Sequence, residues 1–254
     1  MRKLEAEYDK LAEEYDATRD SASEQEIQAI AHSLEDSKTI LDVGVGTGRF
    51  AKPISALGFE VIGVDVSRRM LQKAREKGVD RVLLADGYSL PFRDKVFDGA
   101  IIIHVLHVVV DWSRVMHEIG RVTSGNVATI INASELENQP AESLVKGPSA
   151  SKPEPGGYPV RTQHRLWRNE KELLARVPPT RLERVRDEVV SIPVAEALRR
   201  VEAKRSMGVQ IMPPEARRAI TERLLAMTAG QVVHRRIARD LAVWKADQLT
   251  ALDG

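Results

Sequence analysis

The sequence predicts a doubly wound α/β fold, in which helices cover both faces of a mainly parallel sheet. Between residues 39 and 132, short apolar runs alternate with helical stretches, a pattern typical of parallel strands joined by crossover helices. The predicted strands are apolar almost throughout, which indicates burial on both faces. The first strand ends in a glycine-rich turn that opens a helix.

The composition excludes several classes of protein and site. The 254 residues, 43% of them hydrophobic, suit a single domain over 1–254 with a sizeable core. The absence of cysteine excludes disulfides, thiolate metal centres and cysteine nucleophiles, and no metal site is predicted. The longest apolar run, 101–110, is too short to cross a bilayer, and the charged N-terminus is unlike a secretory signal. We therefore expect a cytoplasmic monomer or homodimer without a membrane span.

The expected elements follow in chain order. Residues Leu4, Tyr8, Leu11 and Tyr15 recur at helical spacing and predict an amphipathic helix over 3–17. Strands are then expected at 39–43, 59–65, 81–86, 97–103 and 126–132, and helices at 50–57, 67–77 and 112–121. Beyond these we expect a Pro- and Gly-rich loop at 138–160, helices at 169–176, 194–206 and 214–228, and a strand at 181–192. Residues 231–243 fit a strand or a helix, and their Val-Val start favours a strand.

A glycine-rich turn follows the first predicted strand, where residues 41–49 read LDVGVGTGR. Glycine at 44, 46 and 48 allows a tight turn and close approach to a ligand, and the next helix adds free N–H donors. A dinucleotide fingerprint requires a third glycine where Arg49 stands, and no Gly-Lys-Ser/Thr triplet is present. The turn therefore predicts a nucleoside site without a pyrophosphate, and a nicotinamide dehydrogenase is a remote alternative.

Two aspartates end the next two predicted strands. A carboxylate at Asp65, 21 residues after Gly44, can accept hydrogen bonds from both hydroxyls of a ribose, although it can also cap the helix that begins near Ser67. Asp86 can accept a hydrogen bond from the exocyclic amine of adenine or form a turn beside Gly87. Met70 fits either an adenine face or the core.

Four strings occur in register: ILDVGVGTGRF, VIGVDVS, ADGYSLPF and FDGAIIIHVLHVVVD. Together they resemble the class I S-adenosylmethionine-dependent methyltransferases, in particular the small-molecule, quinone-biosynthesis-like branch (type 11). The resemblance covers about residues 5–132 and includes YDKLAEEYD, which is similar to a lid helix. It implies a Rossmann-like seven-stranded sheet in the order 3-2-1-4-5-7-6 with an antiparallel last strand. The parts would be an N-terminal helical lid at 1–37, a cofactor-binding half at 38–132, and a loop, helical cap and last strands at 133–254.

The resemblance also implies which residues hold S-adenosylmethionine. Asp42 and the turn from Gly44 to Gly48 match the loop against the methionine part, Asp65 the ribose ligand and Asp86 the adenine ligand. His104 would approach the methionine moiety, and Tyr8 and Tyr15 match aromatic residues of the lid. The whole predicted cofactor site is Tyr8, Tyr15, Asp42, Gly44, Val45, Gly46, Thr47, Gly48, Asp65, Val66, Met70, Asp86, Gly87 and His104.

The predicted function is methyl transfer to a small organic acceptor by in-line displacement, in which the protein chiefly supplies positioning and excludes water. Where the acceptor carries a proton, His107 is the candidate catalytic base, with His104 beside it. The other interpretation of His107 is a structural histidine bonded to a backbone carbonyl. His117 is interpreted as a surface or packing residue.

Charge is distributed unevenly along the chain. Residues 1–150 carry 18 Lys and Arg against 24 Asp and Glu, whereas residues 151–254 carry 20 against 13, and 16 of those 20 are Arg. The cluster of Arg161, His164, Arg165, Trp167 and Arg168 could bind a carboxylate or phosphate of an anionic acceptor, or be a solvated surface. An RNA or nucleoprotein methyltransferase is the alternative function, and a non-catalytic cofactor-binding relative is a third.

Overall fold

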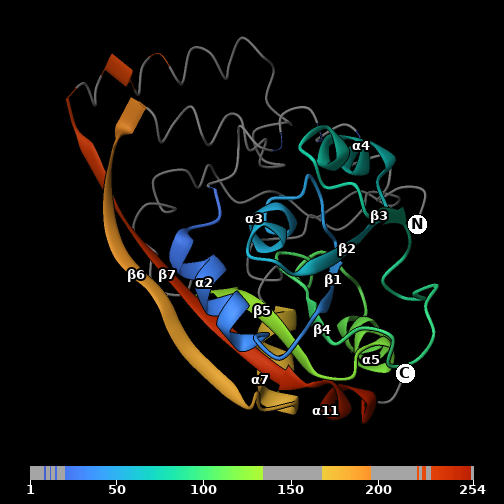
Figure 1. Ribbon diagram of the computed structural model, residues 1–254. Coiled ribbons are helices and arrows are strands. Elements are labelled where there is room, and N and C mark those ends of the chain that lie inside the picture. The colour runs from blue at the N-terminus through green and yellow to red at the C-terminus, as the bar shows by residue number, and fades with distance from the viewer. Residues whose placement is uncertain are drawn as a thin grey trace, which may run out of the picture. The chain divides into compact units, whose positions relative to one another are not determined.

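A seven-stranded sheet forms the centre of the fold, with strands in the order β3-β2-β1-β4-β5-β7-β6 (Figure 1). The computed structural model describes residues 21–133, 168–195 and 230–252, together with Asp9, Ala12, Tyr15, Glu222, Leu225 and Ala226. Its strands are β1 (Thr39–Val43), β2 (Glu60–Asp65), β3 (Val82–Leu84), β4 (Gly99–Ile101), β5 (Asn126–Asn132), β6 (Arg181–Pro193) and β7 (Val232–Lys245). The first five strands pair in parallel and β7 runs antiparallel to β5, so the predicted fold class is confirmed.

Helices cover both faces of this sheet, because each carries an apolar stripe that must be buried. On one face, α2 (Glu24–Ser33), α3 (Ala51–Ala56) and α4 (Arg68–Glu76) bury Ile30, Ile54 and Leu71. On the other, α5 (Trp112–Val122), α7 (Arg168–Arg176) and α11 (Ala246–Thr250) pack around Met116, Leu173 and Leu249. Within the described ranges, no helix is long and apolar enough to cross a membrane.

Three helices, α2, α4 and α5, begin at side-chain caps. The Ser67 hydroxyl accepts a hydrogen bond from the Met70 N–H and starts α4, as the sequence predicts. The sequence analysis placed no separate helix at α2, although the pattern Ser-x-x-Glu signals one. There the Glu26 N–H donates to the Ser23 hydroxyl at 3.2 Å, and the Ser23 N–H donates to the Glu26 carboxylate at 2.8 Å.

The fourth predicted strand was too long. The sequence suggested 97–103, but β4 ends at Ile101 and residues 102–110 form a loop. The Ile102 N–H still donates to the Ala128 carbonyl at 3.1 Å, and the chain then leaves the sheet because His104 adopts a left-handed φ of 58°. The third strand is likewise shorter than the predicted 81–86. Apart from isolated residues, the predicted helices at 3–17, 194–206 and 214–228 and the loop at 138–160 lie outside the described residues.

The chain divides into two compact units. The first comprises 1–132, 162–186 and 239–254, and its described residues include β1 to β5. The second comprises 133–161 and 187–238. Its described part continues β6 and β7, where Arg236 forms a two-fold ion pair with Asp187 at 2.7 Å and the Val194 N–H donates to the Gln231 carbonyl. The expectation of a single domain over 1–254 stays a prediction.

A carboxylate ties the start of β1 to the start of β4. One oxygen of Asp98 accepts hydrogen bonds from the Lys38 N–H at 3.0 Å, the Thr39 N–H at 2.8 Å and the Thr39 hydroxyl at 2.9 Å. Bonds from the Thr39 backbone and side chain, helped by the Lys38 backbone, hold the pKa of Asp98 below its usual value of 3.8.

We expect Asp98→Asn to flatten the acid limb of the stability curve. Because the folded pKa lies below the unfolded one, the stabilising contribution is present above about pH 4 and is lost as the pH falls through the folded value. Urea unfolding between pH 3 and 6 measures this, with Asp36→Asn at an exposed position as the control. If the wild type and Asp98→Asn lose the same free energy of unfolding between pH 6 and pH 3, the stabilising role of the Asp98 carboxylate is contradicted.

Candidate functional site

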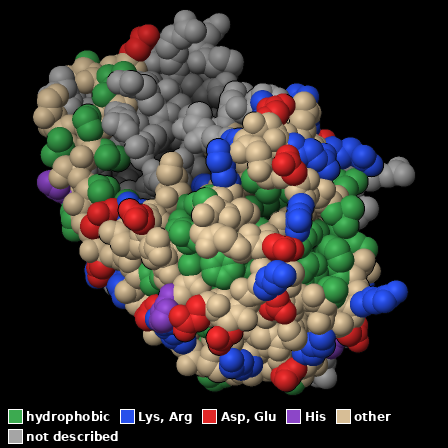
Figure 2. Space-filling view, viewed as in Figure 1, with side chains coloured by type: hydrophobic (Ala, Val, Ile, Leu, Met, Phe, Trp, Pro, Cys, Tyr) green, Lys and Arg blue, Asp and Glu red, His purple; other side chains and the backbone are tan. Residues whose placement is uncertain are grey.

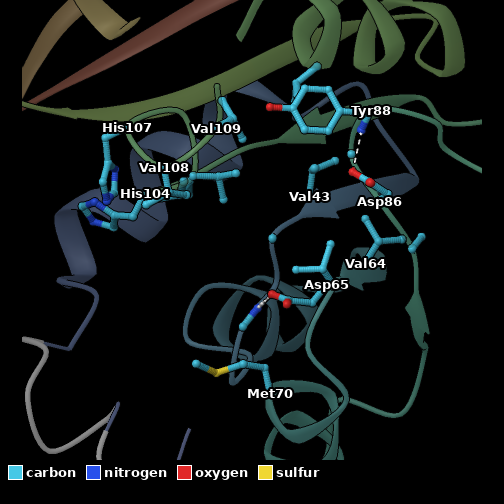
Figure 3. Close-up of a pocket in the computed structure, with 18 of the residues that line it drawn as sticks. Val43, Val64, Asp65, Met70, Asp86, Tyr88, His104, His107, Val108 and Val109 are labelled. Carbon is cyan, nitrogen blue, oxygen red and sulfur yellow. Dashed lines mark hydrogen bonds between the residues drawn. The ribbon is translucent and has the colours of Figure 1, made fainter. Parts of the chain in front are cut away.

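One cavity lies at the carboxyl ends of the parallel strands, where the loops after β1, β2, β3 and β4 meet. Its empty space, which includes the part open to solvent, is about 840 Å³. In Figure 3, Asp65 and Met70 lie below the cavity, Asp86 and Tyr88 on one side, and His104 and His107 on the other. The lining residues are Tyr15, Val43, Gly44, Gly46, Val64, Asp65, Val66, Met70, Ala85, Asp86, Gly87, Tyr88, Ile103, His104, Val105, His107, Val108, Val109 and Val115.

The glycine-rich turn folds tightly onto β2. The N–H groups of Gly44 and Val45 both donate to the Val64 carbonyl, at 2.8 and 3.0 Å. Gly44 has a φ of +77°, and a Cβ there would lie 2.2 Å from a methyl carbon of Val105. Gly46 has a φ of +55°, and its Cβ would meet only a backbone oxygen at 4.0 Å. Space for a ligand therefore exists beside Gly46, whereas Gly44 is needed for packing.

The Asp65 carboxylate joins this turn to the start of α4. Its Oδ2 accepts a hydrogen bond from the Gly46 N–H and its Oδ1 accepts one from the Ser67 N–H, both at 2.9 Å. Burial raises the pKa of Asp65 above 3.8, while the backbone N–H groups, that of Ser67 first, act in the opposite direction. Asp65 thus bonds the start of α4 and also lines the cavity, and its role as the ribose ligand stays a prediction.

Asp86 and Met70 form other parts of the wall. Asp86 accepts a hydrogen bond from the Tyr88 N–H at 3.1 Å, which is the expected turn beside Gly87, and it also lines the cavity. Met70 is 1% exposed in the protein and still borders the cavity. Met70 therefore packs in the core and can also face a ligand in the cavity.

The two histidines come from the loop that follows β4. His104 has a left-handed backbone, which is uncommon outside glycine and costs about 1 kcal/mol or more. Its ring lies 6.5 Å from the rings of Phe50 and His107, measured between centroids. The Nδ1 atom of His107 lies 3.8 Å from Oε1 of Glu170, a buried residue of α7. His117 instead contacts the Leu252 carbonyl through Nδ1 at 2.9 Å, in agreement with its interpretation as a packing residue.

Four predicted cofactor residues do not line the cavity: Asp42, Val45, Thr47 and Gly48. All four are buried in the protein interior. The buried Asp42 carboxyl has its pKa raised from 3.8 to about 7, mainly by burial and then by the Asp65 carboxylate, while Arg49 opposes the shift. These four residues pack in the interior and do not line the cavity, so direct contact between them and a ligand there is not supported.

The N-terminal segment contributes Tyr15 to the cavity wall, whereas Tyr8 lies outside the described residues. Asp9 contacts the start of α4, since its carboxylate accepts hydrogen bonds from the Ser67 hydroxyl at 2.5 Å and the Arg69 N–H at 3.2 Å. The side chains of the predicted Arg161, His164, Arg165, Trp167 and Arg168 cluster also lie outside the described residues. In the described part of the chain, no group of His, Asp and Glu is arranged to hold a metal ion.

Several residues of the site were not among those predicted from the sequence. The Tyr88 hydroxyl accepts hydrogen bonds from the Val110 and Asp111 N–H groups and so joins the loop after β3 to the start of α5. Val105, Val108 and Val109 form part of the apolar wall, but in the sequence they belong to a run that resembles a strand. The position of Tyr88 directly after Gly87 was the one feature of the sequence that could have indicated its place in the site.

Alanine at Gly44 should destabilise the protein more than alanine at Gly58. Both glycines have positive φ values, +77° and +100°, so both substitutions strain the backbone by about 1–2 kcal/mol. Only Gly44→Ala also places a carbon against Val105, and such overpacking adds about 1–3 kcal/mol. Urea unfolding of the two variants isolates the clash, and equal losses would show that Val105 does not confine Gly44.

The effect of Asp42→Asn should depend on pH. The raised pKa means that the contribution of the Asp42 carboxyl to stability is present below about pH 4 and is lost as the pH rises through about 7. Asp42→Asn removes this dependence, so the variant should gain stability relative to the wild type between pH 5 and pH 8. Urea unfolding at pH 5 and pH 8 measures the free energy of unfolding of both proteins. If Asp42→Asn differs from the wild type by the same amount at both pH values, the raised pKa of Asp42 is refuted.

Comparison with known proteins supports the resemblance predicted from the sequence. Residues 41–131 match the family model of a methyltransferase domain. An uncharacterised protein of Methanocaldococcus jannaschii is 38% identical over 134 residues, which are 52% of this chain and 62% of that protein. A tRNA (carboxymethyluridine(34)-5-O)-methyltransferase of Arabidopsis thaliana is 31% identical, covering 55% of this chain and 34% of the relative. For a demethylmenaquinone methyltransferase of Paenarthrobacter aurescens the identity is 30%, with 46% and 49% covered. The chain thus spans less than two thirds of each relative.

Solved structures agree on the fold. The YcgJ protein of Bacillus subtilis superposes with a TM-score of 0.53 at 18% identity, covering 86% of this chain and 97% of that one. The [4+2]-cyclase SpnF superposes with a TM-score of 0.51 at 19% identity, covering 94% of both chains. At such identities the likeness establishes the fold alone. The family match and the sheet order confirm the resemblance to class I S-adenosylmethionine-dependent methyltransferases.

Proposed function

We propose that this chain, whose residues 41–131 form a methyltransferase domain, transfers a methyl group from S-adenosylmethionine to a small organic acceptor. The observation that carries the proposal is the shared cavity, which brings Gly46, Asp65, Asp86 and His104 together at the carboxyl edge of the sheet. These residues come from the loops after four different strands. A crevice at this edge is where open α/β sheets bind nucleosides.

The residues fit the proposed cofactor chemically. A carboxylate has about four lone-pair positions, and two of those on Asp65 accept backbone N–H groups, so acceptors remain for ribose hydroxyls. Asp86 likewise keeps acceptor capacity for an adenine amine beside its bond to Tyr88. Two carboxylates in a largely apolar cavity favour a cation, and the cofactor is a sulfonium.

S-adenosylmethionine supplies an electrophilic methyl group, so the protein needs to orient the reactants and exclude water. Gly46 gives the ligand close access to the turn, and Asp65 would fix the ribose. The valines after β4 and Tyr15 provide apolar walls around the place where transfer would occur. In this arrangement the loops after β1, β2 and β3 bind the cofactor, and the loop after β4 faces the methyl acceptor.

A small, uncharged acceptor fits the described walls best. Among the cavity residues that the structure describes, none is Lys or Arg, so this part of the wall does not support the expected anionic acceptor. One relative is a demethylmenaquinone methyltransferase, whose name implies an apolar quinone acceptor. We retain a cytoplasmic location and a monomer or homodimer as predictions that accompany this proposal.

An RNA acceptor is the second candidate, since one relative is a tRNA methyltransferase. The described arginines of β6 and β7 do not favour it. Arg184 pairs with Asp240, Arg236 with Asp187, and Arg239 with Glu26 at 3.6 Å. On the face seen in Figure 2, Lys and Arg side chains alternate with Asp and Glu and form no continuous basic patch in the described part. The Arg184 and Arg236 pairs support the interpretation of a solvated surface, whereas Arg239 and Glu26 are buried.

Replacement of Asp65 should abolish cofactor binding. Each hydrogen bond donated to a charged acceptor contributes about 1.5–3 kcal/mol, so the loss of two ribose contacts in Asp65→Ala weakens binding by a hundredfold or more. Calorimetric titration with S-adenosylmethionine, S-adenosylhomocysteine and NAD measures this, with the exposed Asp80→Ala as the control. Asp65→Asn, which keeps one acceptor oxygen, separates loss of the charge from disruption of the turn.

The same titration decides between the candidate functions. Binding of the wild type to S-adenosylmethionine supports the nucleoside site, and labelled-methyl transfer into small-molecule or RNA fractions then identifies the acceptor class. Transfer into RNA with a steep salt dependence would favour the second candidate. Binding without transfer would favour a non-catalytic relative, an outcome consistent with the occurrence of this fold in a [4+2]-cyclase. Absence of binding would refute the proposal.

A further inference from the structure

Helix α7 holds the histidine-bearing loop in shape. The side-chain amide of Asn169 donates hydrogen bonds to two carbonyls of that loop, Leu106 at 2.7 Å and Val109 at 3.0 Å. These carbonyls lie on either side of His107 in the sequence. A single side chain therefore fixes the backbone from which His107 extends toward the cavity.

The next residue of α7 places a carboxylate against this histidine. Oε1 of Glu170 lies 3.8 Å from Nδ1 of His107, and the two side chains are only 8% and 14% exposed. His107 lines the cavity and Glu170 does not. A carboxylate is rarely buried to this extent unless a cation or hydrogen-bond donor compensates its charge. An imidazole with a proton on Nδ1 is one neighbour that suits this carboxylate.

We propose that Glu170 is a positioning residue that keeps the proton of His107 on Nδ1, so that Nε2 accepts a proton from a hydroxyl acceptor during methyl transfer. This inference rests on the proposed function and specifies its acceptor as a phenol or enol. The separation of 3.8 Å exceeds a hydrogen bond, as is common for catalytic pairs before the substrate is bound. The arrangement follows the general logic of a base oriented by a third group.

The proposed step is balanced as follows. Nε2 of His107 takes the hydroxyl proton while the hydroxyl oxygen forms a bond to the methyl carbon. The bond between that carbon and the cofactor sulfur breaks, and its electron pair stays on sulfur. The products are the methyl ether, S-adenosylhomocysteine and a His107 imidazolium, whose charge is stabilised by the Glu170 carboxylate.

The charges around the cavity favour a neutral acceptor that loses its proton only during transfer. The other ionisable side chains that line it are Tyr15, Asp65, Asp86, Tyr88 and His104, whose ring centroid lies 6.5 Å from that of His107. The two carboxylates would repel an acceptor that was already anionic. A neutral phenol or enol avoids this repulsion, but it then needs a base, and His107 with Glu170 supplies one.

The first test measures the titration of His107 in the protein without cofactor. In nitrogen-15 histidine spectra, assigned with His107→Asn, we expect Glu170→Gln to lower the titration midpoint of His107 by about one pH unit, because a carboxylate at this distance stabilises the imidazolium. The matched control is Glu172→Gln on the same helix, where the Glu172 carboxylate accepts a hydrogen bond from the Trp112 indole at 3.2 Å. It should leave His107 unchanged, and Glu170→Asp should restore most of the midpoint. An unchanged midpoint in Glu170→Gln overturns the proposal.

The second test concerns the acceptor class. Labelled-methyl transfer to a panel of phenols, enols, amines, thiols and carboxylates should proceed only with the hydroxyl compounds. With such an acceptor, Glu170→Gln should lower kcat more than KM and shift the acid limb of the pH–rate profile to lower pH. Transfer to carboxylates alone overturns the acceptor assignment while the cofactor site stands. Failure of the wild type to bind S-adenosylmethionine refutes the proposed function instead, and the His107 titration remains readable in that case.

Discussion

The Asp65 carboxylate connects the two loops on which the cavity depends. Strands β1 and β2 pair in parallel with Val43 opposite Val64, so their carboxyl ends meet at one edge of the sheet. Asp65 bonds the Gly46 N–H with one oxygen and the Ser67 N–H with the other, and so fixes the glycine-rich turn relative to α4. Because both bonds go to backbone groups, the carboxylate sets the positions of the loops themselves. Any ligand that also binds Asp65 then meets a site whose walls are already in place.

Packing around glycine is the second constraint on this edge of the sheet. A Cβ at Gly44 would lie 2.2 Å from a Val105 methyl carbon, one at Gly63 would lie 2.7 Å from Val45, and one at Gly48 would lie 2.7 Å from Val79. In each case a valine fills the space that the glycine leaves. The turn after β1 is therefore joined to the loop after β4 through Gly44, and to β2 through Gly63. Of the three glycines in the turn, Gly46 is the one with open space beside it, so the conformational freedom of glycine serves packing at two positions and ligand access at the third.

Local patterns in the sequence predicted most helices and strands, but they did not predict which distant segments contact each other. Apolar runs and the Ser67 cap predicted β1, β2, α4 and α5, since these features depend on neighbouring residues. The strand order came from the resemblance, because periodicity carries no information on which strands pair. The end of β4 was misplaced because residues 101–110 are apolar apart from His104 and His107, and nothing marks the left-handed turn at His104. The approach of Asn169 to Leu106, 63 residues earlier, depends on the packing of α7 and has no signal in either segment.

The buried carboxyls give the cavity an electrostatic role that depends on the charge of its ligand. Asp42 and Asp65 lie close enough for Asp65 to raise the pKa of Asp42, and burial raises both. A bound sulfonium would oppose these shifts, so its binding should release protons from the site and strengthen as the pH rises through about 7. Methyl transfer removes the positive charge from the sulfur, and the product then loses this electrostatic stabilisation. In the proposed hydroxyl reaction the charge reappears on His107, beside Glu170 on α7, so the cation before transfer and the cation after transfer are stabilised by different parts of the site.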